Sequence, residues 1–193
     1  MPSDTRRRMI VTTSKLLERQ GFHGTGLNQI LEEANAPKGS MYFHFPGGKN
    51  QLAAEAIAAA TDHIERALRT HEGGTALEAI DGYLAQMSRW LESTGFSGGC
   101  PIATTALEVG ATTPELGEAC EAAFDRLISR VAGWLEADGF DADTARSRAA
   151  LVYSAIEGAL IFSKARRSTE PLSRLRAELP RLVGTPNYFD LKK

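Results

Sequence analysis

Residues 25–49 contain side chains whose types and spacing suit contact with a DNA duplex. Lysine and hydroxyl groups can bond base edges and phosphate oxygens, and tyrosine or phenylalanine rings can contact thymine methyl groups. A histidine and a second lysine at the far end of the stretch suit the phosphate backbone. The candidate DNA-contacting residues are Thr25, Lys38, Ser40, Tyr42, Phe43, His44 and Lys49. For Phe43, packing inside the protein is an equally weighted alternative.

Two short helices joined by a tight turn are expected to position these side chains. Residues 27–34 place apolar side chains at helical spacing, and Asn35 suits the left-handed conformation that ends a helix. Pro37 suits the first turn of the next helix, because that position needs no backbone donor. This second helix directs Met41 and Phe45 to the core and ends before the Pro-Gly-Gly run that follows. The pattern predicts a helix-turn-helix whose second helix can enter the major groove.

The charge distribution favours a DNA-binding N-terminal part. Residues 1–50 hold seven Lys/Arg against four Asp/Glu, whereas residues 51–193 hold fifteen against twenty. A basic segment on an acidic body is typical of a protein that meets phosphates at one end. Arg6, Arg7 and Arg8 can reach a phosphate backbone or form a solvated surface run. The acidic body disfavours an architectural protein, which binds DNA through broad positive charge.

The whole chain is predicted to be all-α, with about nine helices: an N-terminal three-helix head and a C-terminal helical body. The helices are expected near residues 4–20, 27–34, 37–45, 49–71, 75–93, 101–109, 113–136, 141–167 and 171–183. We expect a DNA-binding domain over residues 1–48 and a ligand-binding and dimerisation domain over residues 49–193. No apolar run reaches the ~20 residues of a membrane span, and the N-terminus lacks a signal peptide's apolar core. We therefore expect a cytoplasmic protein with no membrane contact.

Residues 149–162 form an apolar segment that indicates an interface between two chains. A helix that is apolar almost all round is buried on two sides, and one side can pack against a symmetry mate. We therefore expect a homodimer formed by the last two helices, with one large monomeric core as the alternative. Glu157 lies within this segment and needs a partner, either a basic residue or a group in a ligand pocket.

Aromatic and sulfur-containing side chains of the body supply the candidates for a small-molecule pocket, since such pockets are mainly apolar. The tentative ligand-binding residues are Tyr83, Met87, Trp90, Cys100, Phe124, Tyr153 and Glu157. Helical spacing does not rank these residues, and packing in the core is the simpler role for each aromatic one.

Cys100 follows two glycines and precedes Pro101, which is expected to open a helix. A thiol at a helix N-terminus can be activated as a nucleophile and sense electrophiles or oxidants, although a buried, inert thiol is the commoner case. A small helical enzyme using Cys100 with His63 or His71 is a remote alternative. Cys100 and Cys120 are too few for a disulfide framework and lack metal-ligand spacing. We expect no metal, no cofactor and no catalytic residues.

The first ~50 residues resemble the TetR family of one-component transcriptional regulators. The matching residues are Gly21, Phe22, Thr25, Ile30, Ala34, Lys38, Gly39, Ser40, Met41, Tyr42, His44, Phe45, Lys49 and Leu52. Residues 98–110 and the FPGGK linker further resemble the LmrA/YxaF-like branch. Gly26, Asn35 and a linker one residue longer than usual depart from the family pattern, at the start of the second helix and in the turns.

The resemblance implies a homodimer, usually a repressor, that binds a palindromic operator in double-stranded DNA through its N-terminal helices. It also implies a small apolar or aromatic effector in the C-terminal helices, whose binding releases the operator. Carried onto this chain, the resemblance adds Asn28, Gln29 and Gly39 to the candidate DNA-contacting residues.

Overall fold

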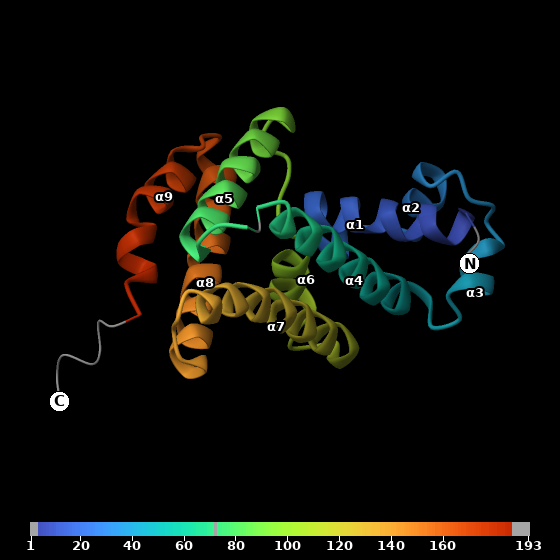
Figure 1. Ribbon diagram of the computed structural model, residues 1–193. Coiled ribbons are helices and arrows are strands. Elements are labelled where there is room, and N and C mark those ends of the chain that lie inside the picture. The colour runs from blue at the N-terminus through green and yellow to red at the C-terminus, as the bar shows by residue number, and fades with distance from the viewer. Residues whose placement is uncertain (1–3, 72, 187–193) are drawn as a thin grey trace. The chain divides into compact units, whose positions relative to one another are not determined.

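The computed structural model describes residues 4–71 and 73–186, which fold into helices joined by short loops (Figure 1). In these residues the helices are α1 (Asp4–Gly24), α2 (Leu27–Glu33), α3 (Ser40–His44), α4 (Gly48–Arg69), α5 (Ala76–Ser93), α6 (Pro101–Val109), α7 (Pro114–Ala137), α8 (Ala142–Arg166) and α9 (Glu170–Val183). The predicted all-α fold is confirmed. Within the described residues, every helix is too short or too polar to span a lipid bilayer.

The helix starts in the body follow from local capping. Thr75 precedes α5, and its hydroxyl accepts a hydrogen bond from the Glu78 backbone while the Glu78 carboxylate accepts one from the Thr75 backbone. Asp141 caps α8 in a similar way, because its carboxylate accepts the Thr144 N–H at 3.0 Å. These bonds satisfy amide groups that have no partner inside the helix.

Two details of the N-terminal helices differ from the sequence prediction. α1 continues past Gln20 to Gly24, with a kink at Gly21, whose φ of 73° lies outside the helical region. α3 begins at Ser40 rather than at Pro37, because the Pro37 carbonyl accepts the Ser40 N–H in a turn. The prediction for Asn35 is confirmed, since its φ is 48°.

The chain folds into two compact units, which we call the head unit and the body unit. The described residues of the head unit are 4–63 and 99–124, and those of the body unit are 64–71, 73–98 and 125–186. The head unit therefore includes α6 and the first part of α7. The predicted domain boundary between residues 48 and 49 divides the chain differently and stays a prediction.

The core of the head unit joins the first four helices. Met9 and Leu16 of α1 belong to one buried cluster with Ile30 of α2, Met41 of α3 and the adjacent Phe45. The predicted inward direction of Met41 and Phe45 is confirmed. Because α3 has only five residues, its position depends on these buried anchors rather than on its own helical stability.

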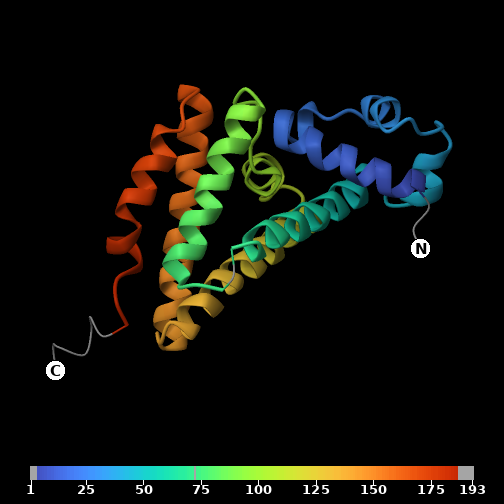
Figure 2. The same ribbon diagram turned by 45° about the horizontal axis from the view of Figure 1, so that its top comes forward.

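In the body unit, α9 lies beside both α5 and α8 (Figures 1 and 2). A two-bond ion pair joins Asp81 of α5 to Arg176 of α9, with both N–O distances at 2.7 Å. The hydrogen bonds from Arg176 lower the pKa of the Asp81 carboxyl. On its outer side α8 exposes three large hydrophobic residues, Leu151, Ile161 and Phe162, which we call the α8 apolar face.

Candidate nucleic-acid interface

The exposed side of α3 carries the predicted recognition groups. Tyr42 is 67 % exposed and Phe43 is 79 % exposed. Exposed Lys38 and Gly39 precede the helix, and half-buried Ser40 begins it. Two neighbouring aromatic rings in solvent provide an apolar contact surface with a phenolic hydroxyl, which matches the methyl groups and hydrogen-bonding edges of a major groove.

Local contacts hold the other polar groups of α3 in place. The Ser40 hydroxyl donates to the Pro37 carbonyl at 2.6 Å, which ties the start of α3 to the preceding turn. The His44 ring meets the Phe43 ring edge-on, with centroids 4.9 Å apart. Half-buried His44 therefore packs beside an exposed aromatic ring at the end of the helix.

Arg8 of α1 binds the turn between α2 and α3. Its Nε donates to the Ala34 carbonyl at 2.9 Å, and its Nη2 donates to the Asn35 carbonyl at 3.1 Å. These carbonyls lie at the C-terminus of α2, where backbone oxygens need donors and the helix dipole favours a cation. Arg8 thus holds the turn that sets the direction of α3.

The other two arginines of this run have different positions. Arg6 forms an ion pair with Glu55 and lies over the Phe45 ring, 5.1 Å from its centroid. Arg7 is exposed. Arg6 and Arg8 therefore make contacts within the protein that neither predicted role described, and the phosphate role of the run stays a prediction.

Replacing Arg8 by alanine is expected to weaken binding to specific DNA by roughly fivefold, about 1 kcal/mol, the scale of a cation at a helix C-terminus. Because Arg8 acts through the turn, the slope of log affinity against log salt should stay unchanged, whereas loss of a phosphate contact reduces that slope by about 1. Anisotropy titrations at several salt concentrations measure both quantities.

Arg7→Ala is the matched comparison for this experiment, since it removes the same charge from an exposed position. If Arg7 contacts a phosphate, this variant should reduce the salt slope, which Arg8→Ala should not. Arg8→Lys should restore part of the affinity, because an ammonium group can still donate to one of the carbonyls. A reduced salt slope in Arg8→Ala would instead assign Arg8 to phosphate binding.

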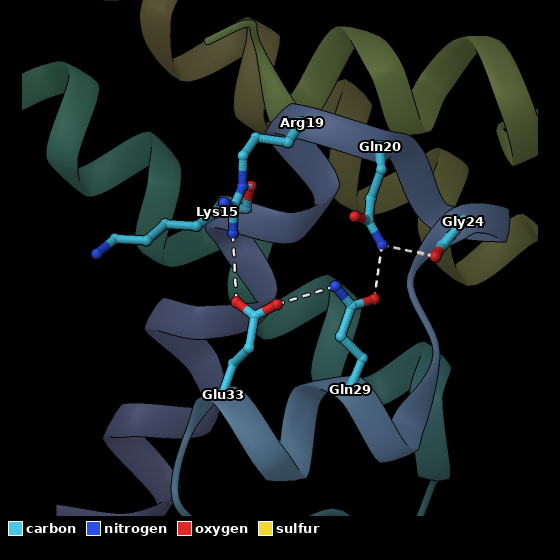
Figure 3. Close-up of polar contacts among 6 residues, drawn as sticks. All are labelled: Lys15, Arg19, Gln20, Gly24, Gln29 and Glu33. Atoms are coloured by element: carbon cyan, nitrogen blue, oxygen red, sulfur yellow. Dashed lines mark hydrogen bonds and ion pairs between the residues drawn. The ribbon is translucent and has the colours of Figure 1, made fainter. Parts of the chain in front are cut away.

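A polar network connects the end of α1 to α2 (Figure 3). Gln20 donates to the Gly24 carbonyl at 2.6 Å and to the Gln29 side chain at 2.8 Å. Gln29 in turn donates to Glu33 at 2.9 Å, and Arg19 donates to the other Glu33 oxygen at 3.3 Å. The network holds α2 against α1. Gln29 is a candidate DNA contact, and the network already engages its side-chain amide. Asn28, another candidate, is exposed.

Thr25 lies just before the start of α2, as predicted, but its side chain points inward. It is fully buried, and its hydroxyl donates to the Gly21 carbonyl at 2.6 Å. Gly26 is the N-cap residue of α2 and provides no side-chain bond. Thr25 therefore fastens the start of α2 to the kink in α1. Its hydroxyl is not exposed in this structure, and its predicted contact with DNA stays a prediction.

Lys49 also contacts the end of α1. Its Nζ donates to the Phe22 carbonyl at 2.6 Å and lies 4.0 Å from the centroid of the Phe22 ring. Burial lowers the pKa of Lys49, and the negative charge of Glu108 opposes that shift. The ammonium group is thus held against the protein at the start of α4, and its predicted contact with phosphate stays a prediction.

Glu108 of α6 meets the kink in α1. Its carboxylate accepts the His23 backbone N–H at 2.8 Å. A Cβ atom at Gly21 would lie only 1.7 Å from a Glu108 oxygen, and the φ of 73° disfavours other residues. Gly21 therefore permits both the kink and the close approach of α6.

Sequence reasoning missed Arg8, Gln20 and Glu108 as groups that position the candidate interface. For Gln20, a local signal existed, because an amide at the end of α1 can reach the carbonyl four residues on. For Arg8 and Glu108, the partners lie 26 and 85 residues away, and no spacing rule indicates them.

The predicted ligand-binding residues occur in both units. Tyr83, Met87 and Tyr153 are buried in the body unit, which also contains half-buried Trp90 and Glu157. None of the seven predicted residues lines either of two grooves of the body unit, which have volumes of about 830 and 430 Å³. Their role in ligand binding stays a prediction.

Both cysteines lie in the head unit and are buried. Cys100 is the N-cap residue of α6, as its position before Pro101 predicted, and its Sγ accepts the Ala103 N–H at 3.4 Å. Burial raises the pKa of the Cys120 thiol to about 11. Among the described residues, no group of three or more His, Cys, Asp and Glu is placed to hold a metal ion.

The chain matches two family profiles. Residues 10–56 match bacterial regulatory proteins of the tetR family, and residues 76–178 match the LmrA/YxaF-like C-terminal domain of transcriptional regulators. An HTH-type transcriptional regulator of Mycobacterium tuberculosis is 35 % identical over 184 residues, which cover 92 % of this chain and 93 % of that protein. The HTH-type regulator LmrA of Bacillus subtilis is 33 % identical over 182 residues, with coverage of 93 % and 97 %.

Solved structures have the same fold. The regulatory protein TetR from Rhodobacter sphaeroides has a TM-score of 0.83 at 22 % identity, covering 93 % of this chain and 99 % of that chain. The reduced form of NemR from E. coli has a TM-score of 0.77 at 25 % identity, with coverage of 94 % and 98 %.

Proposed function

This chain belongs to the TetR family of helix-turn-helix transcriptional regulators, with an LmrA/YxaF-like C-terminal domain, and we propose that it is a ligand-responsive repressor. Two copies bind a palindromic operator in the cytoplasm. Binding of a small apolar or aromatic molecule to the C-terminal helices releases the operator. The family and the relatives of the chain are transcriptional regulators rather than enzymes.

The observation that carries this proposal is the exposed aromatic pair on α3. Tyr42 and Phe43 project from a helix whose opposite side, at Met41, is anchored in the core. The Ser40 hydroxyl ties the start of this helix to the preceding turn, so that both ends of the contact surface have a defined place. A rigid, exposed recognition helix of this kind supports insertion into a major groove.

The α8 apolar face supports the proposed homodimer through α8 and α9. Leu151, Ile161 and Phe162 are each more than half exposed, and Phe162 borders a groove of about 430 Å³ that Pro171 of α9 also lines. Apolar side chains of this size on one helix indicate a partner surface. Under two-fold symmetry, this face can pack against the same face of a second copy.

The mechanism that we propose is a population shift between two arrangements of the dimer. In the DNA-binding state, the two α3 helices reach successive major grooves, about 34–36 Å apart. The effector binds more tightly to a state in which this spacing is wrong, so that operator affinity falls. The transmitter is α4, because it follows the helix-turn-helix directly in the chain and contains residues of both units.

Titration with the DNA upstream of the coding region tests the proposed function. We expect a dissociation constant of about 10⁻⁸ M or below and at least ~10³-fold weaker binding to a shuffled duplex of the same length. The stoichiometry should be two chains per inverted repeat, measured by anisotropy at concentrations above the dissociation constant. Equal affinity for the shuffled duplex would contradict sequence-specific regulation.

A thiol sensor acting through Cys100 is the second candidate for the same DNA-binding output. The position of Cys100 at the N-terminus of α6 favours this candidate. Its exposure of 7 % opposes it, because reagents must reach the sulfur. An enzyme that uses Cys100 with His63 or His71 has less support, since the His71 ring forms a hydrogen bond with the Gln86 side chain at 3.0 Å.

A further inference from the structure

The body unit contains a groove that none of the predicted ligand-binding residues lines. It has a volume of about 830 Å³ and is bordered by the end of α4, the glycines that follow it, one side of α7 and Arg146 of α8. This volume lies within the range of about 300–1,000 Å³ that small-molecule sites occupy. We call it the arginine groove.

One face of α7 supplies most of the functional groups in the arginine groove. Arg126, Arg130 and Trp134 follow one another at intervals of four residues, which places them along one side of a helix. Two guanidinium groups and an indole ring therefore line a single wall. Trp134 is half-buried, which leaves part of its ring available to a ligand.

The charge of the groove favours a negatively charged occupant. Its lining contains three arginines, at 126, 130 and 146, and two carboxylates, at 65 and 125, an excess of one positive charge. Arg126 pairs with Glu65 at 2.8 Å. Arg146 donates to Asp125 at 3.0 Å and to Ser129 at 3.2 Å. Each guanidinium has five N–H donors in a fork, so that Arg146 can hold these partners and a further carboxylate or sulfonate.

Two glycines that line the groove, Gly73 and Gly133, leave open space beside their backbone. A Cβ atom at Gly133 would meet no atom within 4 Å, and the same holds at Gly73. Gly133 lies inside α7, about one turn before its end at Ala137, where glycine costs about 1 kcal/mol of helix stability relative to alanine. The open space at Gly133 lies on the same side of α7 as Arg126 and Arg130, where a planar group has room.

From these features we propose that the arginine groove binds a small planar organic anion, such as an aromatic carboxylate or sulfonate. The acidic group bonds the guanidinium groups of Arg146 and Arg126. The ring lies over Gly133 and against the indole of Trp134. This inference concerns binding alone and does not depend on the proposed response of the operator.

Calorimetry with 2-naphthoate tests this proposal, and neutral 2-naphthamide is the matched probe with the same ring. We expect 2-naphthoate to bind the full-length protein with one site per chain and a dissociation constant below about 1 mM. The naphthamide should bind at least tenfold more weakly, since it lacks the charge. No heat of binding for 2-naphthoate, or equal affinities for the two probes, would overturn the proposal.

Two variants test whether 2-naphthoate binds in the arginine groove. Gly133→Leu places a side chain in the open space at Gly133, where a Cβ atom meets nothing within 4 Å, and should weaken 2-naphthoate binding at least tenfold. Ala122→Leu introduces leucine at an exposed α7 position outside the groove and should leave the binding unchanged. Arg146→Gln should weaken binding at least fivefold. Circular dichroism melts confirm that each variant is folded. Unchanged binding in Gly133→Leu would refute the assignment.

Discussion

Replacing Phe162 by aspartate is expected to separate the two chains and to lower operator affinity by at least a hundredfold. Phe162 is 60 % exposed in the single chain and is the most exposed residue of the α8 apolar face. Burying a phenylalanine contributes about 1.5–3 kcal/mol, and two-fold symmetry doubles the loss. A carboxylate in place of the ring adds a desolvation cost. A monomer contacts only one half-site of the palindrome.

Sedimentation equilibrium measures the separation of the chains, and anisotropy measures the loss of operator affinity. Leu107→Asp is the matched control, because it introduces the same charge at a leucine of α6 that is 80 % exposed. The control should remain dimeric. A dimeric Phe162→Asp protein would exclude the α8 apolar face as the interface.

Replacing Tyr42 by alanine is expected to weaken operator binding at least tenfold while the dimer and the fold remain intact. The Tyr42 side chain is 67 % exposed on α3, so that its removal leaves the head core unchanged. One good contact with a base contributes about 1–3 kcal/mol of discrimination, and a dimer loses two. Tyr42→Phe should retain the part of the affinity that arises from the ring.

Anisotropy titrations against the operator and a shuffled duplex measure this effect of Tyr42→Ala. Val11→Ala, which shortens an exposed apolar residue of α1, serves as the control. If Tyr42 reads bases, the affinity for the shuffled duplex should fall much less than that for the operator. Unchanged operator affinity in Tyr42→Ala would remove Tyr42 from the interface.

The secondary structure was predictable because its determinants are local. Thr75 with Glu78, Asp141 before α8 and proline at the start of α6 each act within one helical turn, and the structure has these helix starts. Asn35 adopts the expected left-handed conformation for the same reason. The start of α3 was less predictable, because Pro37 is compatible both with a first helical turn and with the tight turn that it forms here.

The positions of the candidate interface residues were only partly predictable, because sequence spacing does not show which partners a long side chain reaches. Tyr42 faces outward as its spacing from Met41 and Phe45 indicated, and Phe43 is exposed rather than packed inside the protein, the alternative that the sequence left open. Lys49 has the charge of a phosphate-binding residue, yet its ammonium group bonds a carbonyl of α1. A flexible lysine or arginine can meet solvent, DNA or a distant carbonyl, and only tertiary packing selects among them.

The composition of the head unit, residues 4–63 together with 99–124, restricts how this protein can be recombined with its relatives. A chimera made by a single crossover after α4 would join the α1 of one regulator to the α6 of another. Where the second regulator has another residue at the position of Glu108, the Gly21 kink meets a different side chain and the His23 N–H loses this acceptor. A double crossover that transfers both segments, or a graft confined to the exposed residues of α3, keeps this contact intact when operator specificity is exchanged.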